Sequence, residues 1–387
     1  MPLMPLMPPP ARPDAACTRR RLLLGASALL ATLGDRTHAQ AQAPSGVAAP
    51  ALVLRDDDAA LVPFNHRAGD DELADLKRRL AQTRWPEAET LPGWAQGVPL
   101  ASMQALVRHW QGDASSGGYD WRRCEAAMAA WPQFKTRIDG LGVHFMHVRS
   151  RHPNALPIML THGWPSTFLL FQDVIGPLTD PVAHGGDAAD AFDVVIPSLP
   201  GFGFSDRPGA AGWNAARTAR AWAVLMARLG YGRYVAQGGD WGAFVTTAMA
   251  QQQATGLAAI HLNFAQTIPD RIPPKSRLTP DQTKAVAAWK AFRETGSAYL
   301  QVQATRPQTI GYALLDSPVA LAAWIYDIYD SGSGRTGKPE QRIPLDRMLD
   351  EITLYWLSAT GASSARLYQE QAKAGATTPA ACRCRWA

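Results

Sequence analysis

The 387-residue sequence has few cysteines and no concentration of positive charge. It contains four cysteines, Cys17, Cys124, Cys382 and Cys384, and none shows the paired spacing of a zinc site or a disulfide framework. The formal net charge is +5, of which residues 1–43 contribute +3 through five arginines and two aspartates. The remainder is near +2, without a basic cluster interleaved with aromatics. The sequence therefore does not support nucleic-acid binding, and its cysteines indicate neither a metal site nor a disulfide framework.

The sequence also has no apolar run long enough to cross a membrane. Its N-terminal apolar run, residues 22–33, would span about 18 Å as a helix, against about 30 Å for a bilayer core. That run follows Arg19-Arg20-Arg21 and precedes the small-residue sites Ala39-Gln40-Ala41 and Ala41-Gln42-Ala43. We therefore predict that residues 1–43 form a cleaved twin-arginine signal, with export to the periplasm and no stable membrane span. Residues 44–60, small and polar, are predicted to be a linker.

The rest of the chain has the pattern of an α/β protein. Residues 62–138 are predicted to be helical with loops, because Leu73, Leu76 and Leu80 recur at helical spacing behind an acidic helix start. Strands are predicted at 143–148, 157–161, 192–196, 234–237 and 259–262, and helices at 168–175, 215–229 and 243–253. Buried strands alternating with helices predict a largely parallel sheet, whose ligands bind at the carboxyl ends of the strands.

The motif with the most chemical content is Gly238-Gly239-Asp240-Trp241-Gly242. It lies between a strand pattern and a helix pattern, as does the turn that presents a catalytic nucleophile in many α/β enzymes. Glycine tolerates the strained turn, and an aspartate there favours attack on saturated carbon with formation of an ester. The alternative is an ordinary Gly-Gly-Asp turn.

A second motif, His162-Gly163-Trp164-Pro165, directly follows the strand predicted at 157–161. The backbone N–H groups of Trp164 and Trp241 are candidates for an oxyanion hole. His162 precedes the Gly238–Gly242 turn in the sequence, where a general base is not expected. We therefore interpret it as a structural histidine that supports the loop, together with Gly163 and Pro165.

These motifs resemble those of the microsomal-type epoxide hydrolases, and the resemblance extends over about residues 60–372. The matching stretches are Pro63-Phe64 to Trp85-Pro86, Trp131-Pro132-Gln133-Phe134, His162 to Pro165, Pro197 to Ser205, Gln237 to Gly242, Thr305 to Thr309, Asp316-Ser317-Pro318 and Tyr355-Trp356. The resemblance implies an α/β-hydrolase fold with an N-terminal helical region (61–140), a core (141–264), a helical cap (265–357) and a return segment (358–387).

The resemblance also implies the chemistry. Asp240 would attack an epoxide carbon, while Tyr299 and Tyr368 polarise the ring oxygen and donate its proton. Four aromatics would wall an apolar pocket: Trp289, Phe292, Trp324 and Tyr326. The partners would be a small apolar epoxide and water, in aromatic hydrocarbon catabolism or detoxification. No cofactor and no metal are expected, and homo-oligomerisation and the natural epoxide stay open.

The sequence departs from the family pattern after Tyr368. The last of its nine histidines is His261, so neither the family's water-activating histidine nor its orienting acid is found. Glu370 is the only carboxylate side chain beyond Tyr368, and we expect it to be helical and exposed. We also expect the fold to end before the last two family strands, with a tail whose Cys382-Arg383-Cys384-Arg385 ending suggests a shifted reading frame.

Two other functions remain open at this point. One is a haloalkane dehalogenase-like hydrolase, which also uses an aspartate followed by tryptophan. The other is an inactive fragment that only binds apolar ligands. Because Tyr299 and Tyr368 favour an oxygen leaving group over a halide, we rank the epoxide first, with turnover in question.

Overall fold

The computed structural model describes residues 59–112, 117–264, 272, 274–332 and 337–374. The predicted signal, nearly all of the predicted linker and residues 375–387 lie outside these ranges. In the part of the chain that is described, no helix combines the length and the apolar character needed to cross a bilayer.

Seven strands form one mixed sheet in the order β1-β2-β3-β5-β4-β6-β7. Their bounds are β1 Val62–Phe64, β2 Gln133–Ile138, β3 Leu141–Val148, β4 Leu156–Thr161, β5 Phe192–Pro197, β6 Tyr234–Gly238 and β7 Leu257–Leu262. β5, β4, β6 and β7 are parallel, whereas β1, β2, β3 and β5 pair antiparallel. The prediction of a largely parallel sheet is therefore right only for the half that carries the two motifs.

The prediction that residues 62–138 contain only helices and loops was wrong at both ends. β1 and β2 are strands, and β2 forms a hairpin with β3 through the two-residue turn Asp139-Gly140. Both turn residues have positive φ, 54° and 77°. Asp-Gly between apolar runs is a strong hairpin signal, and it was overlooked because the alternating pattern was read only from Val143 onward.

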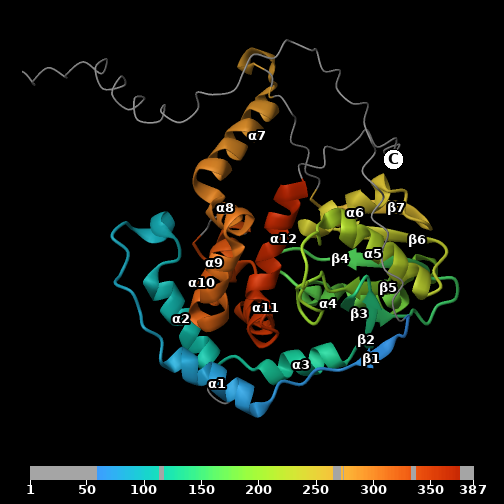
Figure 1. Cartoon of the computed structure of the whole chain (residues 1–387), viewed down its shortest axis with the longest axis horizontal. Helices are drawn as coiled ribbons and strands as arrows, with labels where there is room; N and C mark the ends of the chain where they lie inside the picture. The colour runs from blue at the N-terminus through green and yellow to red at the C-terminus, as the bar shows by residue number, and fades with distance from the viewer. Residues whose placement is uncertain (1–58, 113–116, 265–271, 273, 333–336, 375–387) are drawn as a thin grey trace, which may run out of the picture. The chain divides into compact units, whose positions relative to one another are not determined.

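The helices beside the core sheet follow the predicted ones closely. α5 (Ala215–Arg228) and α6 (Trp241–Gln251) match the predictions at 215–229 and 243–253. The helix predicted at 168–175 is instead a short 3-10 helix, η3 (Phe168–Phe171), continued by α4 (Gln172–Thr179). Figure 1 shows α4, α5 and α6 around the sheet.

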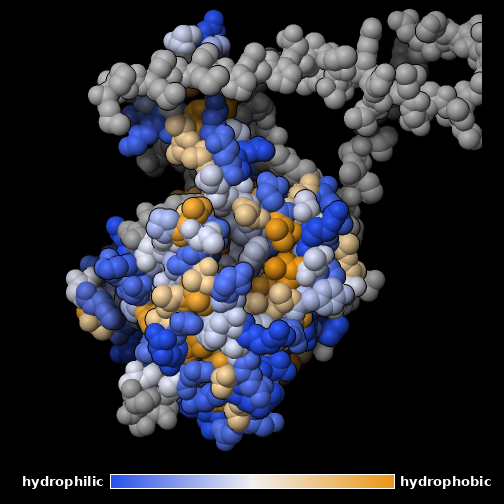
Figure 2. All heavy atoms as spheres, turned by 90° about the vertical axis from the view of Figure 1, so that its left-hand side faces the viewer, coloured by the Kyte–Doolittle hydropathy of each residue, from blue (hydrophilic) through white to orange (hydrophobic). Residues whose placement is uncertain are grey.

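The remaining helices form an N-terminal group and a cap. The first group is α1 Asp70–Ala81, α2 Leu100–Gln111 and α3 Trp121–Ala129. The second is α7 Pro280–Ala291, α8 Ala298–Thr305, α9 Pro307–Asp316, α10 Pro318–Gly332 and α11 Leu345–Leu357, and α12 Gly361–Ala374 follows it. Figure 1 shows α1 and α2 beside α10, and α12 between the cap and the sheet. The side drawn in Figure 2 is mostly hydrophilic, with small separate apolar patches.

The N-terminal helix α1 forms where its sequence predicts it. Asp70, Asp71 and Glu72 occupy its first turn, and Leu76 and Leu80 are buried. Acidic residues at a helix N-terminus interact favourably with the helix dipole. Helix α1 contacts α2 of its own group and α10 of the cap.

Candidate active site

Asp240 lies on a strained turn between β6 and α6. Its φ of 50° and ψ of −124° fall in a region that non-glycine residues rarely adopt. The glycines two positions to either side permit this geometry. A Cβ on Gly238 would overlap the carbonyl of Gly242, and a Cβ on Gly242 would overlap the carbonyl of Thr161. The sequence motif is therefore an elbow that projects the Asp240 side chain at the carboxyl edge of the sheet.

The Asp240 carboxylate faces the loop that follows β4. The backbone N–H of Trp164 donates to Asp240 Oδ1 over 2.9 Å. Burial raises the pKa of Asp240, and the N–H groups of Trp164 and Trp241 oppose that rise by stabilising the carboxylate. Gly163 is required here, since a Cβ at that position would overlap the Asp240 side chain. The loop and the elbow together form a pair of N–H donors around one carboxylate.

His162 fixes the start of this loop rather than facing Asp240. Its Nε2 accepts the backbone N–H of Leu199 (3.1 Å), which leaves Nδ1 to donate to the carbonyl of Gly163 (2.9 Å). Complete burial lowers the pKa of His162 to about 4, so the ring is neutral. The peptide bond between Trp164 and Pro165 is cis.

Tyr299 of α8 and Tyr368 of α12 meet above Asp240. Their ring centroids lie 6.0 Å apart at an angle of 81°. Tyr299 stacks on Trp164 (5.3 Å, 10°), and Tyr368 packs edge-on against Trp241 (4.7 Å, 82°). Two phenols, one from a cap helix and one from α12, thus contact the two tryptophans whose N–H groups face Asp240.

Both phenols are held in the protonated form. Burial, followed by the nearby Asp240 carboxylate, raises the pKa of Tyr299 to about 12. The same two causes, in the same order, raise the pKa of Tyr368 well above its usual value. A neutral phenol next to a carboxylate can donate a proton to an oxygen that becomes negatively charged.

The four aromatics expected to wall the pocket do not form this cluster. Phe292 is 36% exposed, and Tyr326 is directed toward Trp94 (5.7 Å between centroids) and Glu340, to which its hydroxyl donates. Trp324 donates its indole N–H to Gln303, and the guanidinium of Arg293 lies over the ring of Trp289 (5.2 Å to the centroid). The aromatic cluster beside Asp240 is formed instead by Trp164 and Trp241, from the two motifs, and by the two tyrosines.

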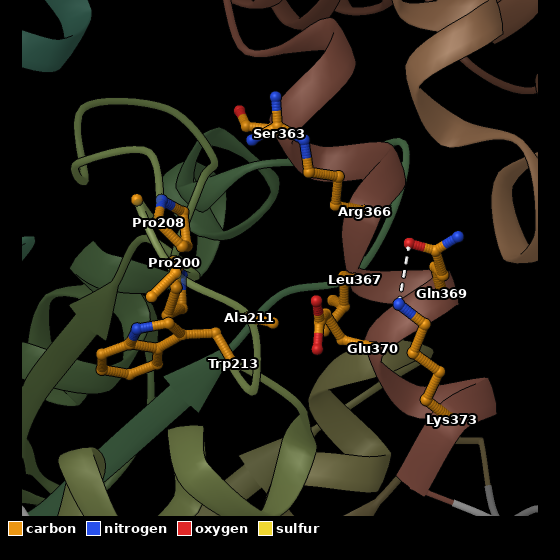
Figure 3. A pocket seen from close by; sticks show the side chains of 12 residues that line it. Pro200, Pro208, Ala211, Trp213, Ser363, Arg366, Leu367, Gln369, Glu370 and Lys373 are labelled. Carbon is orange, nitrogen blue, oxygen red and sulfur yellow. Dashed lines mark hydrogen bonds between the residues drawn. The ribbon is translucent and has the colours of Figure 1, made fainter.

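The prediction that Glu370 is exposed was wrong. Glu370 is in helix α12, as expected, but it is half-buried and its Oε2 accepts the backbone N–H of Gly212 over 2.7 Å. Figure 3 shows its carboxylate directed toward the loop of Ala211 and Trp213. The space between α12 and this loop is a pocket of about 280 Å³. Neither Asp240 nor either tyrosine lines it, so it is separate from the carboxylate site.

No histidine among the described residues is hydrogen-bonded to Asp240. The other fully buried histidine, His144, has its ring nitrogens occupied by Ser198 (2.9 Å) and Gln133 (3.0 Å). Residues 59–374, where described, also contain no cluster of three or more metal-ligating side chains.

The sequence reading overlooked a buried carboxyl group near this site. Glu351 of α11 accepts a hydrogen bond from Thr167 Oγ1 over 2.7 Å, and both side chains are buried. A signal is present in the sequence, because Asp350 and Glu351 lie between the apolar pairs Met348-Leu349 and Ile352/Leu354 of one helix. The partner of Glu351 in a distant loop is not visible in the sequence.

Comparisons with known proteins agree with this geometry. Residues 61–171 match the family model "Epoxide hydrolase N terminus", and residues 157–295 match the model for the alpha/beta hydrolase fold. A putative epoxide hydrolase of Stigmatella aurantiaca is 55% identical over 312 residues, which cover 81% of this chain and 70% of that protein.

The chain belongs to the epoxide hydrolases. Epoxide hydrolase 1 of Sus scrofa is 32% identical over 339 residues, with 81% of this chain and 73% of the pig protein covered. Among solved structures, the epoxide hydrolase of Aspergillus niger has a TM-score of 0.68 and 30% identity, covering 80% of this chain and 78% of that one. Juvenile hormone epoxide hydrolase from Bombyx mori has a TM-score of 0.69 and 29% identity, and the match covers 81% of this chain and 77% of that one.

The family membership and the α/β-hydrolase fold confirm the resemblance stated from the motifs. At the level of the family, the protein is an epoxide hydrolase whose reactants are an epoxide and water.

Proposed function

We propose that this epoxide hydrolase opens apolar or aromatic epoxides through an ester on Asp240, with vicinal diols as the products. The observation that carries the proposal is the convergence of one carboxylate, two N–H donors and two protonated phenols. The Trp164 N–H holds Asp240 Oδ1 at 2.9 Å, so we assign Oδ2 as the attacking oxygen. The aromatic rings around it suit a substrate of low polarity.

The reaction follows from these positions. Asp240 forms a bond to one ring carbon while the bond from that carbon to the ring oxygen breaks. The electron pair moves to the oxygen, which takes a proton from Tyr299 or Tyr368. The tyrosinate regains a proton from the water that hydrolyses the ester, and this step also restores the Asp240 carboxylate. The Trp164 and Trp241 N–H groups support the carboxyl oxygen throughout, as oxyanion-hole donors do. His162, Gly163, Pro165, Gly238, Gly239 and Gly242 hold the two turns in place.

Hydrolysis of the Asp240 ester is the slow step of the proposed reaction. Water needs a general base to attack the ester, and no described histidine is hydrogen-bonded to Asp240. Members of a catalytic unit act together, so a site without that base would turn over more slowly by orders of magnitude. We therefore propose that the 387-residue chain forms the ester much faster than it hydrolyses it.

Peptide mass spectrometry tests ester formation, and an assay of the diol tests ester release. The chain is incubated with an aryl epoxide such as styrene oxide, quenched and digested. We expect one epoxide mass added on the peptide that contains Asp240, no addition in Asp240→Asn, and slow diol release. Rapid diol release would contradict slow hydrolysis, and a chain with neither adduct nor diol would contradict the proposed function. Chloride release from a haloalkane, without reaction of the epoxide, would favour a dehalogenase.

We further propose that residues 1–43 direct export through the twin-arginine route to the periplasm. The support is the Arg19-Arg20-Arg21 sequence before an apolar run that is too short to span a bilayer. Replacing Arg19, Arg20 and Arg21 with lysine should retain the protein in the cytoplasmic fraction of a bacterial host. Equal periplasmic amounts of the variant and the unchanged chain would rule this out.

A further inference from the structure

A buried hydrogen bond connects the cap to the loop that carries the Trp164 N–H. Glu351 of α11 is 6% exposed and Thr167 is fully buried, and the Thr167 hydroxyl donates to Glu351 Oε2 over 2.7 Å. The same hydroxyl accepts the backbone N–H of Leu169 (3.2 Å), so its position is fixed from both sides. Thr167 lies three residues after Trp164 and precedes η3, which makes it the end of the loop.

The start of the loop is also fixed from α11. One helical turn after Glu351, the ring of Tyr355 packs edge-on against Phe202 (6.3 Å), and Phe202 packs edge-on against His162 (5.5 Å). His162 holds the carbonyl of Gly163. Helix α11 therefore contacts the loop at Thr167 directly and at His162 through Phe202, on either side of Trp164.

We propose that Glu351 and Thr167 are positioning residues for the reaction assigned above, an inference that rests on the proposed function. Their hydrogen bond sets where the Trp164 N–H lies relative to Asp240. Without it, only a backbone hydrogen bond of Thr167 still ties the loop end to Glu351, and the N–H donor at Trp164 is held less firmly against the Asp240 carboxylate. Asp240 is then less stabilised as an anion, and ester formation is slower.

The neighbouring buried carboxyl group of Asp350 provides a matched control. It is also buried, at 2% exposure for its side chain, but it bonds to Tyr119 (2.9 Å) and Arg123 (2.7 Å) of the N-terminal region. Asp350→Asn removes a buried charge one residue away without touching Thr167. A general loss of cap stability would therefore appear in both sets of variants, whereas an effect on Trp164 would appear only with Glu351 or Thr167.

The experiment uses Glu351→Leu, which deletes the whole contact with Thr167, and Thr167→Val, which deletes its side-chain hydrogen bond. Thr167→Ser and Glu351→Gln retain that hydrogen bond. The rate of ester formation with styrene oxide is measured in single turnover as a function of pH. Thr167→Val and Glu351→Leu should react about tenfold more slowly at an almost unchanged half-saturating concentration. The acid limb of their rate-against-pH profiles should shift to higher pH by about half a unit or more, because Asp240 is harder to ionise.

The conservative variants should stay close to the unchanged chain, and Asp350→Asn should not move the acid limb. Folded Glu351→Leu with an unaltered rate and acid limb would overturn the inference. The pKa of Asp240 can also be measured without substrate, from carbon-13 NMR of labelled aspartate compared with Asp240→Asn. If the unmutated protein forms no ester, the proposed function is refuted. The NMR comparison would still decide whether Glu351 and Thr167 act on Asp240.

Discussion

At the level of single residues, Asp240 is subject to opposing effects. Burial raises its pKa, while the N–H groups of Trp164 and Trp241 favour the ionised form that attacks. Ester formation should therefore slow as the pH falls through the pKa of Asp240. The two phenols act at the other end of the breaking bond, and their roles can be separated by mutation.

Tyr299→Phe and Tyr368→Phe each remove one proton donor with little change in shape. Each should slow ester formation by about 100-fold, within the usual range for a general acid, and the double variant should form almost no ester. Single-turnover kinetics on styrene oxide provide the measurement. Tyr312→Phe is a suitable control, because Tyr312 is 70% exposed on α9. Full activity in the double variant would exclude the phenols as donors.

Glu351 should make the stability of the protein depend on pH. Burial, its largest influence, raises the pKa of Glu351 to about 8, Asp350 raises it further, and Thr167 and Arg347 lower it. An unfolded glutamate ionises near pH 4.3, so between about pH 4.3 and 8 the native state binds more protons than the unfolded state. The contribution of Glu351 to stability is therefore full at low pH and falls as the pH rises through this window.

Glu351→Gln removes this dependence, since glutamine does not titrate. Urea unfolding of both proteins is measured at pH 5, 6, 7 and 8. As the pH rises, the free energy of unfolding should fall more steeply for the unmutated chain than for Glu351→Gln, by roughly 1 kcal/mol per pH unit. The difference between the two curves isolates this residue from the other titrating groups. Parallel curves would mean that Glu351 is already ionised at low pH in the folded protein.

At the level of elements, the turn at Asp240 depends on close approach of backbone segments. In Gly242→Ala, the new methyl group would overlap the Thr161 carbonyl, and neither backbone can move easily. We expect a loss of about 3 kcal/mol or more in unfolding free energy. Gly232→Ala is the control, because nothing lies within 4 Å of a Cβ placed there. Calorimetry of the two variants distinguishes a crowded turn from a general glycine effect.

Elements with strong local signals could be predicted from the sequence. The elbow, β4 and its loop, α1 and α5 each have a pattern of turn residues or apolar spacing that acts over a few residues. The strands β1 and β2 were missed because β1 is short and exposed, and because the Asp139-Gly140 turn was not used to extend the pattern backward. Contacts such as that of Glu351 with Thr167 depend on how the cap folds over the core, which local patterns do not determine.

At the level of the whole molecule, α12 joins the cap to the core. It carries Tyr368 on one side, while Ser363 donates to the carbonyl of Gly201 (2.6 Å) and Glu370 accepts the N–H of Gly212 (2.7 Å). These contacts hold the phenol over the elbow from outside the site. They also explain why Glu370 could not be judged from helical periodicity, since its partner is a backbone group in a distant loop.

Glu370→Ala should lower the stability of the folded chain by about 1 to 2 kcal/mol, because the Gly212 N–H loses its acceptor. Glu370→Gln keeps an acceptor oxygen and should recover most of that loss. Thermal unfolding measures both variants. Equal losses in the two would indicate that the negative charge, rather than the hydrogen bond, holds the loop to α12.

The parallel stack of Trp164 on Tyr299 joins a core loop to a cap helix by two ring systems that absorb ultraviolet light. Their 5.3 Å separation and 10° angle permit electronic coupling, so the protein contains an intrinsic optical reporter of cap and core contact. Near-ultraviolet circular dichroism and tryptophan emission should therefore follow separation of the cap from the core without any attached dye, and Tyr299→Leu provides the spectrum of the uncoupled indole.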